Sequence, residues 1–440
     1  MFDQFRAKRG LGRGRAWLVF ASIAGLCGPL TAAQKTELVS ESIFGASANG
    51  QSFTASLSKS GRYVAFASSA SDLVPGDTNG QLDVFVRDRE RGTIERVSVD
   101  RNGNDANGGS GNASISGDGR FVAFESAASN LVLGDLNFTT DVFVRDRKHD
   151  FTFRVSVSST GGEANAFSSY PAISGDGSQV TFLSNASTLV AGDTNARKDV
   201  FVRHLNFGVT RRVSVSSTGA QGNGDSGTAS ISWDGHYVVF VSEASNLDPF
   251  DANGVSDTFL HDLHTGRTRR VSEAGGGLVE GNAASFAGHI SDDGRFVYFA
   301  SAASNLVAND VNGVNDVFVS DLRTGGLTRI SVSSQGVPSD ADSILGNISK
   351  NGRYAIFRSS SDQLVPGDTN GTSDAFLFDR RNGKVRRVSL SFNGGQANAT
   401  IWDPVLSANG RIAAFDSVAS NLVRRDANGL DDVFVRRLKR

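Results

Sequence analysis

The sequence predicts an all-β fold, a seven-bladed β-propeller with four antiparallel strands in each blade. The first observation behind this prediction is a unit that returns seven times, at spacings of 58 or 59 residues. A turn glycine after an Ile-Ser or Leu-Ser pair marks each copy: Gly61, Gly119, Gly177, Gly235, Gly294, Gly352 and Gly410. Such self-similarity indicates an array of identical supersecondary units, and the single added residue falls between 271 and 294.

The second observation is that each unit contains four short strand-like segments and shows no helical periodicity. In the first unit a tight turn at Gly61 follows the first strand, a polar loop from 67 to 82 follows the second, and a turn near Gly92 precedes the fourth. Open sheets of so many strands do not occur, so we expect the units to close into a ring. The strands expected in this unit are 55–58, 62–66, 83–88 and 95–99.

Two aromatic positions recur without exception. Phe66 on the second strand and Phe85 on the third are phenylalanine in all seven units. A ring at the same place in every repeat is expected in the core, where it packs blade against blade, rather than in a ligand site.

The two ends of the chain predict how the ring closes. The last unit stops after its third strand, 433–436, and lacks a fourth. Val39 lies 58 residues before Val97, so the N-terminal segment reads as an unpaired fourth strand that completes the seventh blade. This closure would hide the strand edges that a linear array exposes. We also expect Glu37 to pair with Arg437 across the completed blade.

The first 33 residues read as a secretory signal peptide, which leaves 34–440 as the propeller. Basic residues precede a mostly apolar segment from 16 to 30, and small residues end it before Gln34. The apolar part is too short to span a membrane, and no other span is expected. Cys27, the only cysteine, lies in this segment, so we expect no disulfide in the mature chain. The predicted location is the periplasm or the exterior.

The charge balance restricts the partners. A formal net charge of −2 argues against a dedicated nucleic-acid binder. We expect a monomer that binds a cell-envelope protein or a polysaccharide.

An Asp-x-Asn-x-x-x-Asp loop precedes the third strand of every unit and is a candidate calcium site. Oxygens at its positions 1, 3 and 7 can converge on a hard cation. Without metal, the same side chains can stabilise a turn by bonding to nearby backbone groups, and the sequence leaves both interpretations open. The candidate ligands are Asp77, Asn79, Asp83, Asp135, Asn137, Asp141, Asp193, Asn195, Asp199, Asp251, Asn253, Asp257, Asp310, Asn312, Asp316, Asp368, Asn370, Asp374, Asp426, Asn428 and Asp432.

The paired carboxylates of this loop need a positive partner. Arg87 is one candidate, but its equivalents are His261, Ser320 and Phe378 in three units, so we expect that arginine is not the general answer. If the loops hold no metal, their carboxylates should form an acidic ring on one face. We then expect a partner to prefer the opposite face or the channel.

Arginines begin the fourth strand in six units, and we expect them to pair with carboxylates at the end of the third strand across the hairpin. The arginines are Arg96, Arg154, Arg212, Arg270, Arg329 and Arg387. The expected partners are Asp88, Asp146, Asp262, Asp321 and Asp379.

Catalytic motifs are absent from the sequence: it has no nucleophile elbow, phosphate loop or metal-binding cysteine pair. The residues that break the repeat symmetry are Trp233, His289, Trp402 and Asp403. They are few and do not share one unit, which favours binding over catalysis.

The motifs ISGDGRFVAF, DVFVRD and TRRVSVS, in that order within the unit, resemble the TolB-type, WD-like propeller repeats of bacterial envelope proteins. The resemblance covers the whole mature chain, except that the extra N-terminal domain of TolB is missing and the loop between the second and third strands is longer. It implies a scaffold, a binding module or a non-catalytic part of a peptidase.

Together these observations predict a non-catalytic, secreted or periplasmic propeller that binds a protein or polysaccharide and is stabilised by calcium if the loops hold it. The alternative is a propeller enzyme, a lyase or hydrolase that acts on an extracellular polysaccharide or peptide at the channel mouth.

Overall fold

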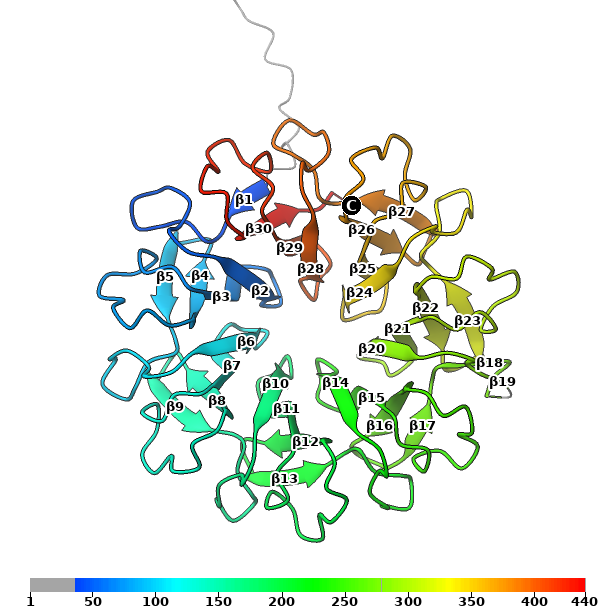
Figure 1. The fold of residues 1–440 in the computed structure, drawn as a ribbon, viewed down its shortest axis with the longest axis horizontal. Coiled ribbons are helices and arrows are strands. Elements are labelled where there is room, and N and C mark those ends of the chain that lie inside the picture. The colour runs from blue at the N-terminus through cyan, green and yellow to red at the C-terminus, as the bar shows by residue number, and fades with distance from the viewer. Residues whose placement is uncertain (1–35, 278, 440) are drawn as a thin grey trace, which may run out of the picture. The chain divides into compact units, whose positions relative to one another are not determined.

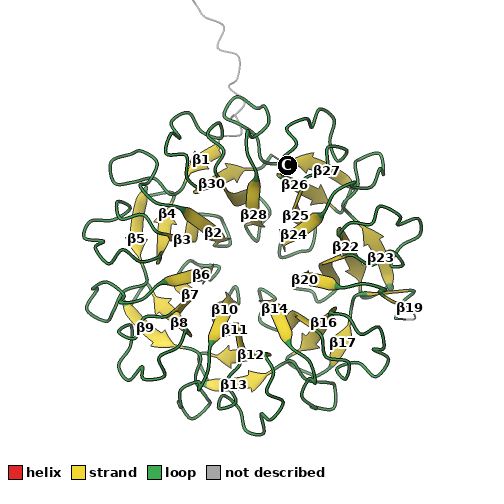
Figure 2. Ribbon diagram, in the orientation of Figure 1, coloured by secondary structure: helices red, strands yellow, loops and turns green. Residues whose placement is uncertain are grey.

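The computed structural model describes residues 36–439 except 278, and it shows seven four-stranded antiparallel sheets set around a central channel (Figures 1 and 2). The all-β propeller predicted from the repeats is confirmed. The predicted signal peptide lies outside the described residues and stays a prediction. In the described part of the chain, no helix is long and apolar enough to cross a membrane.

Each blade runs outward from the channel, one strand after the next. The innermost strands are β2 (Ser52–Leu57), β6 (Ser110–Ile115), β10 (Ser168–Ile173), β14 (Ser226–Ile231), β20 (Ser285–Ile290), β24 (Ser343–Ile348) and β28 (Ile401–Leu406). The second strands are β3 (Tyr63–Ser68), β7 (Phe121–Ser126), β11 (Gln179–Ser184), β15 (Tyr237–Ser242), β21 (Phe296–Ser301), β25 (Tyr354–Ser359) and β29 (Ile412–Ser417).

The third strands carry the most regular part of the repeat. They are β4 (Asp83–Asp88), β8 (Asp141–Asp146), β12 (Asp199–His204), β16 (Asp257–Asp262), β22 (Asp316–Asp321), β26 (Asp374–Asp379) and β30 (Asp432–Arg437). The outer strands are β5 (Thr93–Arg96), β9 (Phe151–Arg154), β13 (Val209–Arg212), β17 (Thr268–Arg270), β23 (Gly326–Arg329), β27 (Lys384–Arg387) and β1 (Thr36–Leu38). A small extra hairpin, β18 (Glu273–Ala274) with β19 (Val279–Glu280), lies in the segment that holds the added residue.

The N-terminal strand completes the seventh blade, as predicted. β1 pairs antiparallel with β30, with Glu37 opposite Val435 and Leu38 opposite Phe434. The expected pair of Glu37 with Arg437 is wrong, because the Glu37 carboxylate instead meets the Arg89 guanidinium of the first blade at 2.7 Å. Closure therefore depends on backbone pairing and apolar burial, and the ion pair joins neighbouring blades.

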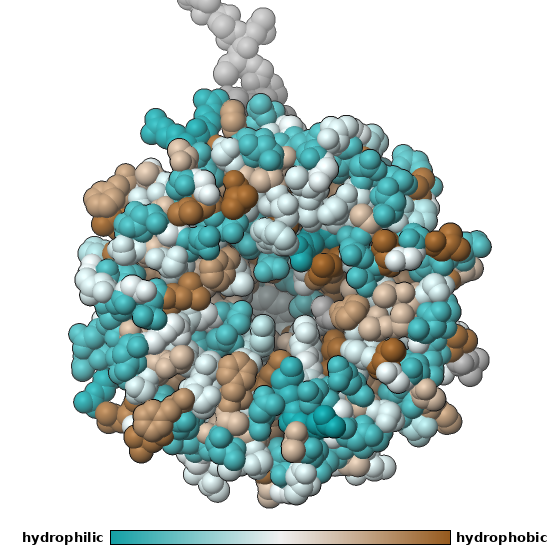
Figure 3. Space-filling view, in the orientation of Figure 1, coloured by the Kyte–Doolittle hydropathy of each residue, from teal (hydrophilic) through white to brown (hydrophobic). Residues whose placement is uncertain are grey.

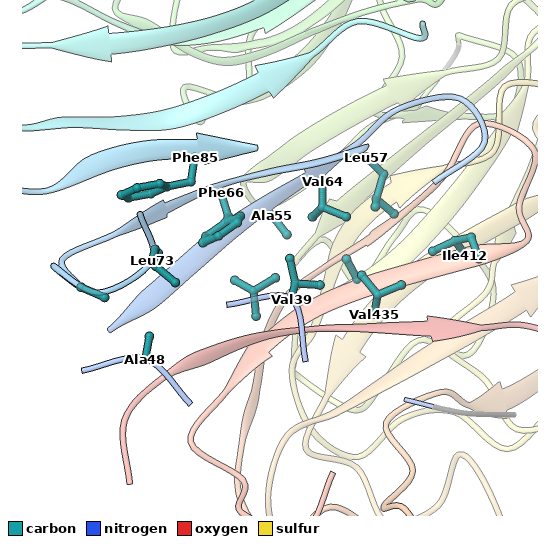
Figure 4. Close-up of a cluster of buried hydrophobic side chains, with 13 residues drawn as sticks. Val39, Ala48, Ala55, Leu57, Val64, Phe66, Leu73, Phe85, Ile412 and Val435 are labelled. Atoms are coloured by element: carbon teal, nitrogen blue, oxygen red, sulfur yellow. The ribbon is translucent and has the colours of Figure 1, made fainter. Parts of the chain in front are cut away.

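The core lies between the blades (Figure 4). Phe66 and Phe85 are fully buried with ring centroids 5.9 Å apart, and they share a cluster with Val39 and Val435 from the seventh blade. Burial of one such ring stabilises the fold by about 1.5–3 kcal/mol. The predicted core role of the repeated phenylalanines is confirmed.

The two faces of the ring differ in what they present. On one face, here called the loop face, lie the long loops between second and third strands and those between consecutive blades. The other, the turn face, carries only the tight turns, such as those at Gly61 and Gly92. Chain direction in each sheet sets this arrangement, because innermost strands start at the loop face and end at the turn face.

Hydrogen bonds tie the channel together at the turn face. The Lys59 amide donates to the Gly117 carbonyl, the Gly117 amide to Gly175 and the Gly175 amide to Trp233. Trp233 donates its amide to the Asp292 side chain, and the links continue through the later blades back to the Lys59 carbonyl. The Trp233 ring lies so close to Gly117 and Gly175 that a methyl group at either would overlap it. The Trp233 ring and these hydrogen bonds therefore close-pack the turn-face end of the channel.

Candidate functional site

The repeated Asp-x-Asn loops form one bonded arrangement seven times. In the first, the buried Asp83 accepts hydrogen bonds from Ser98 Oγ and, at 2.8 Å, from Asn79 Nδ2, which also donates to the Ala106 carbonyl. The Asn side chain bonds the second Asp in every loop, at 2.7 to 3.0 Å. The loops thus have the turn-stabilising role that the sequence left open.

Arginine provides the positive charge in six of the seven loops. Arg96 Nη1 lies 2.9 Å from Asp77 Oδ1 and 3.4 Å from Asp83 Oδ2, and the arginine side chain is 7% exposed. The same bridging contact is made by Arg154, Arg212, Arg270, Arg329 and Arg387.

Two expectations from the sequence are therefore wrong. Arginine is the positive partner of the paired aspartates in six loops. It comes from the outer strand of the blade and is not Arg87. The expected pairing of Arg96 with Asp88 fails because Arg96 lies opposite Phe85, three residues before Asp88 on the third strand, while Thr93 lies opposite Asp88. Asp88 instead receives a bidentate contact from Arg62 at 2.9 and 2.6 Å, which lowers the pKa of its carboxyl to about 2.

The expected acidic ring on the surface is also wrong, because these carboxylates are buried. The side chain of Asp77 is 4% exposed, and burial raises the pKa of Asp135 and of Asp251 to about 6. Among the described residues, no three His, Cys, Asp or Glu side chains gather to hold a metal. Calcium binding in these loops stays a prediction.

The channel mouth on the loop face carries strained backbone. All seven innermost strands shift register near their start, and five non-glycine residues there have positive φ. They are Thr54, Asn112, Tyr170, Thr228 and Asp403, and all five line a recess of about 240 Å³. Bulges of this kind aim side chains, and such strain persists where the surrounding structure holds it, often at functional sites. Figure 3 shows the hollow at the centre of the ring.

One carboxyl group near this recess, in the seventh blade, is buried and carries an unusual charge environment. Asp416, on β29, is 3% exposed, and its Oδ1 has no hydrogen-bond partner among the described residues. Burial, with the nearby charges of Asp403 and Asp431, raises the pKa of Asp416 to about 8, although hydrogen bonds from the backbone of Thr54 and from its own backbone oppose the rise. Asp416 is therefore a protonated acid at neutral pH.

Two further groups of aromatic and polar side chains lie at this end of the blades. Trp402 is 42% exposed, and the Arg358 guanidinium lies over its ring, 4.7 Å from the ring centre. On the second blade, Glu125 accepts a bond from Asn112 Nδ2 at 2.8 Å and another from the Tyr170 amide at 2.9 Å. The mouth thus offers a partly exposed indole, which an arginine covers on one face, and several carboxyl and amide groups.

The structure separates the other symmetry-breaking residues from this mouth. Trp233 lies at the turn-face end, and His289 lines a deeper recess of about 150 Å³. Burial lowers the pKa of His289 to about 4, so its imidazole is neutral. The four residues belong to three blades, as expected, and only Trp402 and Asp403 share one.

Sequence reasoning missed Asp416, Arg358 and Glu125. One signal could have found them. They occupy the same position of the repeat, whose other members are Ala67, Leu183, Val241 and Ala300. A charged residue in an otherwise apolar position of a buried strand indicates a special role.

Replacing Asp416 with Asn should remove a pH dependence of stability. In the native state Asp416 keeps its proton up to about pH 8, whereas in the unfolded chain it loses it near its ordinary pKa. Native protein then holds one more proton, so stability falls as pH rises between these values, by at most about 1.4 kcal/mol per pH unit. Thermal melts from pH 5 to 8 should show D416N flatter than wild type and more stable at pH 8. Parallel curves would contradict this assignment.

Among comparisons with known proteins, only the search of solved structures finds similar proteins. A scan against protein-family models and a search of curated proteins each find no match. Among solved structures, an oligogalacturonate lyase in complex with manganese aligns with a TM-score of 0.55 at 11% identity, over 92% of this chain and 96% of that one.

Two further structures extend the comparison. The β-propeller domain of the Trilobed protease from Pyrococcus furiosus aligns with a TM-score of 0.52 at 10% identity, over 89% of this chain and 94% of that one. The putative TolB from Agrobacterium tumefaciens also matches, with a TM-score of 0.40 at 15% identity over 79% of this chain and 94% of that one. At these identities the alignments with the lyase and with the protease domain show similarity of the propeller fold alone.

Proposed function

We propose that this protein is a non-catalytic, periplasmic or secreted propeller that binds a neutral oligosaccharide segment of a cell-envelope polysaccharide at its loop-face mouth. The observation that carries the proposal is the asymmetry of the mouth on an otherwise sevenfold ring: Asp403, Tyr170 and Asn112 line the recess. Trp402, the chain neighbour of Asp403, stacks with Arg358 of the sixth blade. Concave sites with exposed aromatic faces and a few fixed polar groups suit such ligands.

The charges of the mouth support a neutral ligand over an anionic one. Asp403 and Glu125 contribute carboxyl groups to the rim, while Arg358 is engaged with the Trp402 ring. An acidic polymer would meet these carboxylates as like charges, whereas hydroxyl groups of a neutral sugar can donate hydrogen bonds to them.

Exposed apolar side chains favour the loop face as the side that meets a partner. Leu136, Phe138, Phe250 and Val311, at the tips of its loops, are between 69% and 91% exposed. Groups of exposed apolar residues often mark interaction surfaces. This reverses the preference for the opposite face that the expected acidic ring implied.

Replacing Trp402 with Ala should weaken oligosaccharide binding about 30-fold, the effect of losing roughly 2 kcal/mol from a central aromatic contact. Glycan arrays followed by calorimetry on the mature protein would identify the ligand and measure this loss. Phe151→Ala is the control, because Phe151 is 58% exposed on the turn face. Binding of envelope proteins but of no glycan would replace this proposal with the protein-binding alternative.

A second candidate function is an enzyme that cleaves an extracellular polysaccharide, and the protonated Asp416 beside Asp403 favours it. A carboxyl group with a raised pKa can donate a proton to a leaving group while a second carboxylate nearby stays ionised. Release of reducing ends or unsaturated sugars from envelope polysaccharides, lost in both D416N and D403N, would support it. Binding without any product would favour the non-catalytic function.

A further inference from the structure

The seventh loop differs from the other six in the residue that faces its two aspartates. In the first blade Arg96 lies opposite Phe85, and in the seventh blade Leu38 lies opposite Phe434, the equivalent phenylalanine. Leu38 therefore occupies the position of the bridging arginine. Leucine carries no charge and is too short to reach the loop, so the seventh blade does not supply the guanidinium that bridges the pair elsewhere.

A second substitution removes a further partner from this loop. In the first blade Arg96 also contacts Asp105. For the seventh loop the equivalent of Asp105 is Ser47, which lies one repeat earlier in the sequence and carries no charge. Ser47 Oγ donates to Asp426 Oδ1 at 3.3 Å. Asp432 keeps its usual bonds, from Ser40 Oγ at 2.5 Å and from Asn428 Nδ2 at 2.8 Å.

Asp426 remains with an unbonded carboxylate oxygen. The residue is 8% exposed, and its Oδ2 has no hydrogen-bond partner among the described residues. The equivalent aspartates in the other six blades all lie within 3.5 Å of an arginine nitrogen. Arg424 and Arg425 precede Asp426, but both are exposed, and neither lies within ion-pair distance of it in the described structure.

The geometry points to a cation site in the seventh loop: we propose that one hard divalent cation, calcium by its coordination chemistry, takes the place that the arginine guanidinium holds in the six other loops. Asp426 and Asp432 would supply the charge, and Ser47 Oγ and loop carbonyl oxygens the neutral ligands. Calcium accepts such an irregular oxygen set, whereas magnesium requires near-ideal octahedral geometry.

Burial decides between an ion and a partner's side chain. Asp426 Oδ2 lies out of contact with solvent, so an arginine or lysine from another protein could reach it only if the blade opened. A small dehydrated ion can be enclosed as the loop folds. Two buried carboxylates without a counter-charge are costly, which gives the ion its binding energy.

The test measures calcium alone binding to the chelator-treated mature protein by calorimetry and equilibrium dialysis. We expect about one ion per chain and a rise of several degrees in melting temperature on calcium addition. No binding, or about seven ions per chain, would overturn the proposal. The first result would mean that the carboxylates share a proton, and the second that the bridging arginines do not exclude metal.

Two variants locate the ion. Leu38→Arg supplies the missing guanidinium and should abolish calcium binding. The melting temperature of this variant should then not change when calcium is added. Asp426→Asn should also weaken binding at least tenfold, and it covers the case in which L38R does not fold. The matched control is Thr93→Arg, which adds the same charge at an exposed position of β5. Calcium binding that survives in both L38R and D426N would refute the seventh-loop assignment.

Discussion

Removing residues 34–44 from a chain that begins at residue 34 should lower its melting temperature by about 10 °C or more, a loss of several kcal/mol for a ring of this size. β1 completes the sheet of the seventh blade, so its removal exposes the backbone groups of β30. It also removes Val39, which is 1% exposed within the cluster that joins the first and last blades. Because the ring depends on this junction, the effect should spread beyond one blade.

Thermal melts and analytical ultracentrifugation would measure this outcome. The control is a chain cut at residue 33, which keeps every strand of the ring. An unchanged melting temperature with a monomeric truncated protein would contradict closure by β1. Dimers in the truncated protein would agree with it, since an exposed edge strand invites pairing with a second chain.

Replacing Arg96 with Met should destabilise the protein at pH 7 by about 3–5 kcal/mol, as expected when one partner of a buried ion cluster is lost. Arg96 is the counter-charge of Asp77, Asp83 and Asp105, and its removal leaves the first two buried without one. Burial already raises the pKa of Asp77 and Asp83, and Arg96 opposes that rise.

The pH dependence of this variant distinguishes lost charge pairing from lost packing. Without Arg96 the native carboxyls should hold protons that the unfolded chain has released, so the deficit should grow with rising pH. Denaturant unfolding at pH 5 and pH 7 should therefore show the smaller loss at pH 5. Arg91→Met, at a side chain that is 76% exposed, should have little effect at either pH. An equal loss at both values would assign the effect to packing alone.

The architecture followed from local and periodic features of the chain. Strand β4 lies at the expected residues 83–88, and the end strands pair as the orphan segment at Val39 predicted. Repeats make this possible because one unit is stable only against its neighbours, so seven copies with a missing strand at one end and an extra strand at the other imply a closed ring. The buried Phe66 and Phe85 pairs were also predictable, since only a core position keeps one aromatic residue through every copy.

The partners of the charged side chains were decided by the tertiary structure. Arg96 and Asp88 lie close along the hairpin, yet strand pairing places Arg96 beside Asp83 and gives Asp88 to Arg62. A shift of strand register by one residue moves each side chain to the other face of the sheet and so changes which charged groups meet. Sequence periodicity alone does not determine this register. The mouth is a similar case. Asp403 comes close to Asp416, and Trp402 meets Arg358 of the sixth blade, only because ring closure and the bulged innermost strand bring these positions to one end of the channel. The repeat thus determines the ring, while ring closure and strand register determine which departures from the repeat become a site.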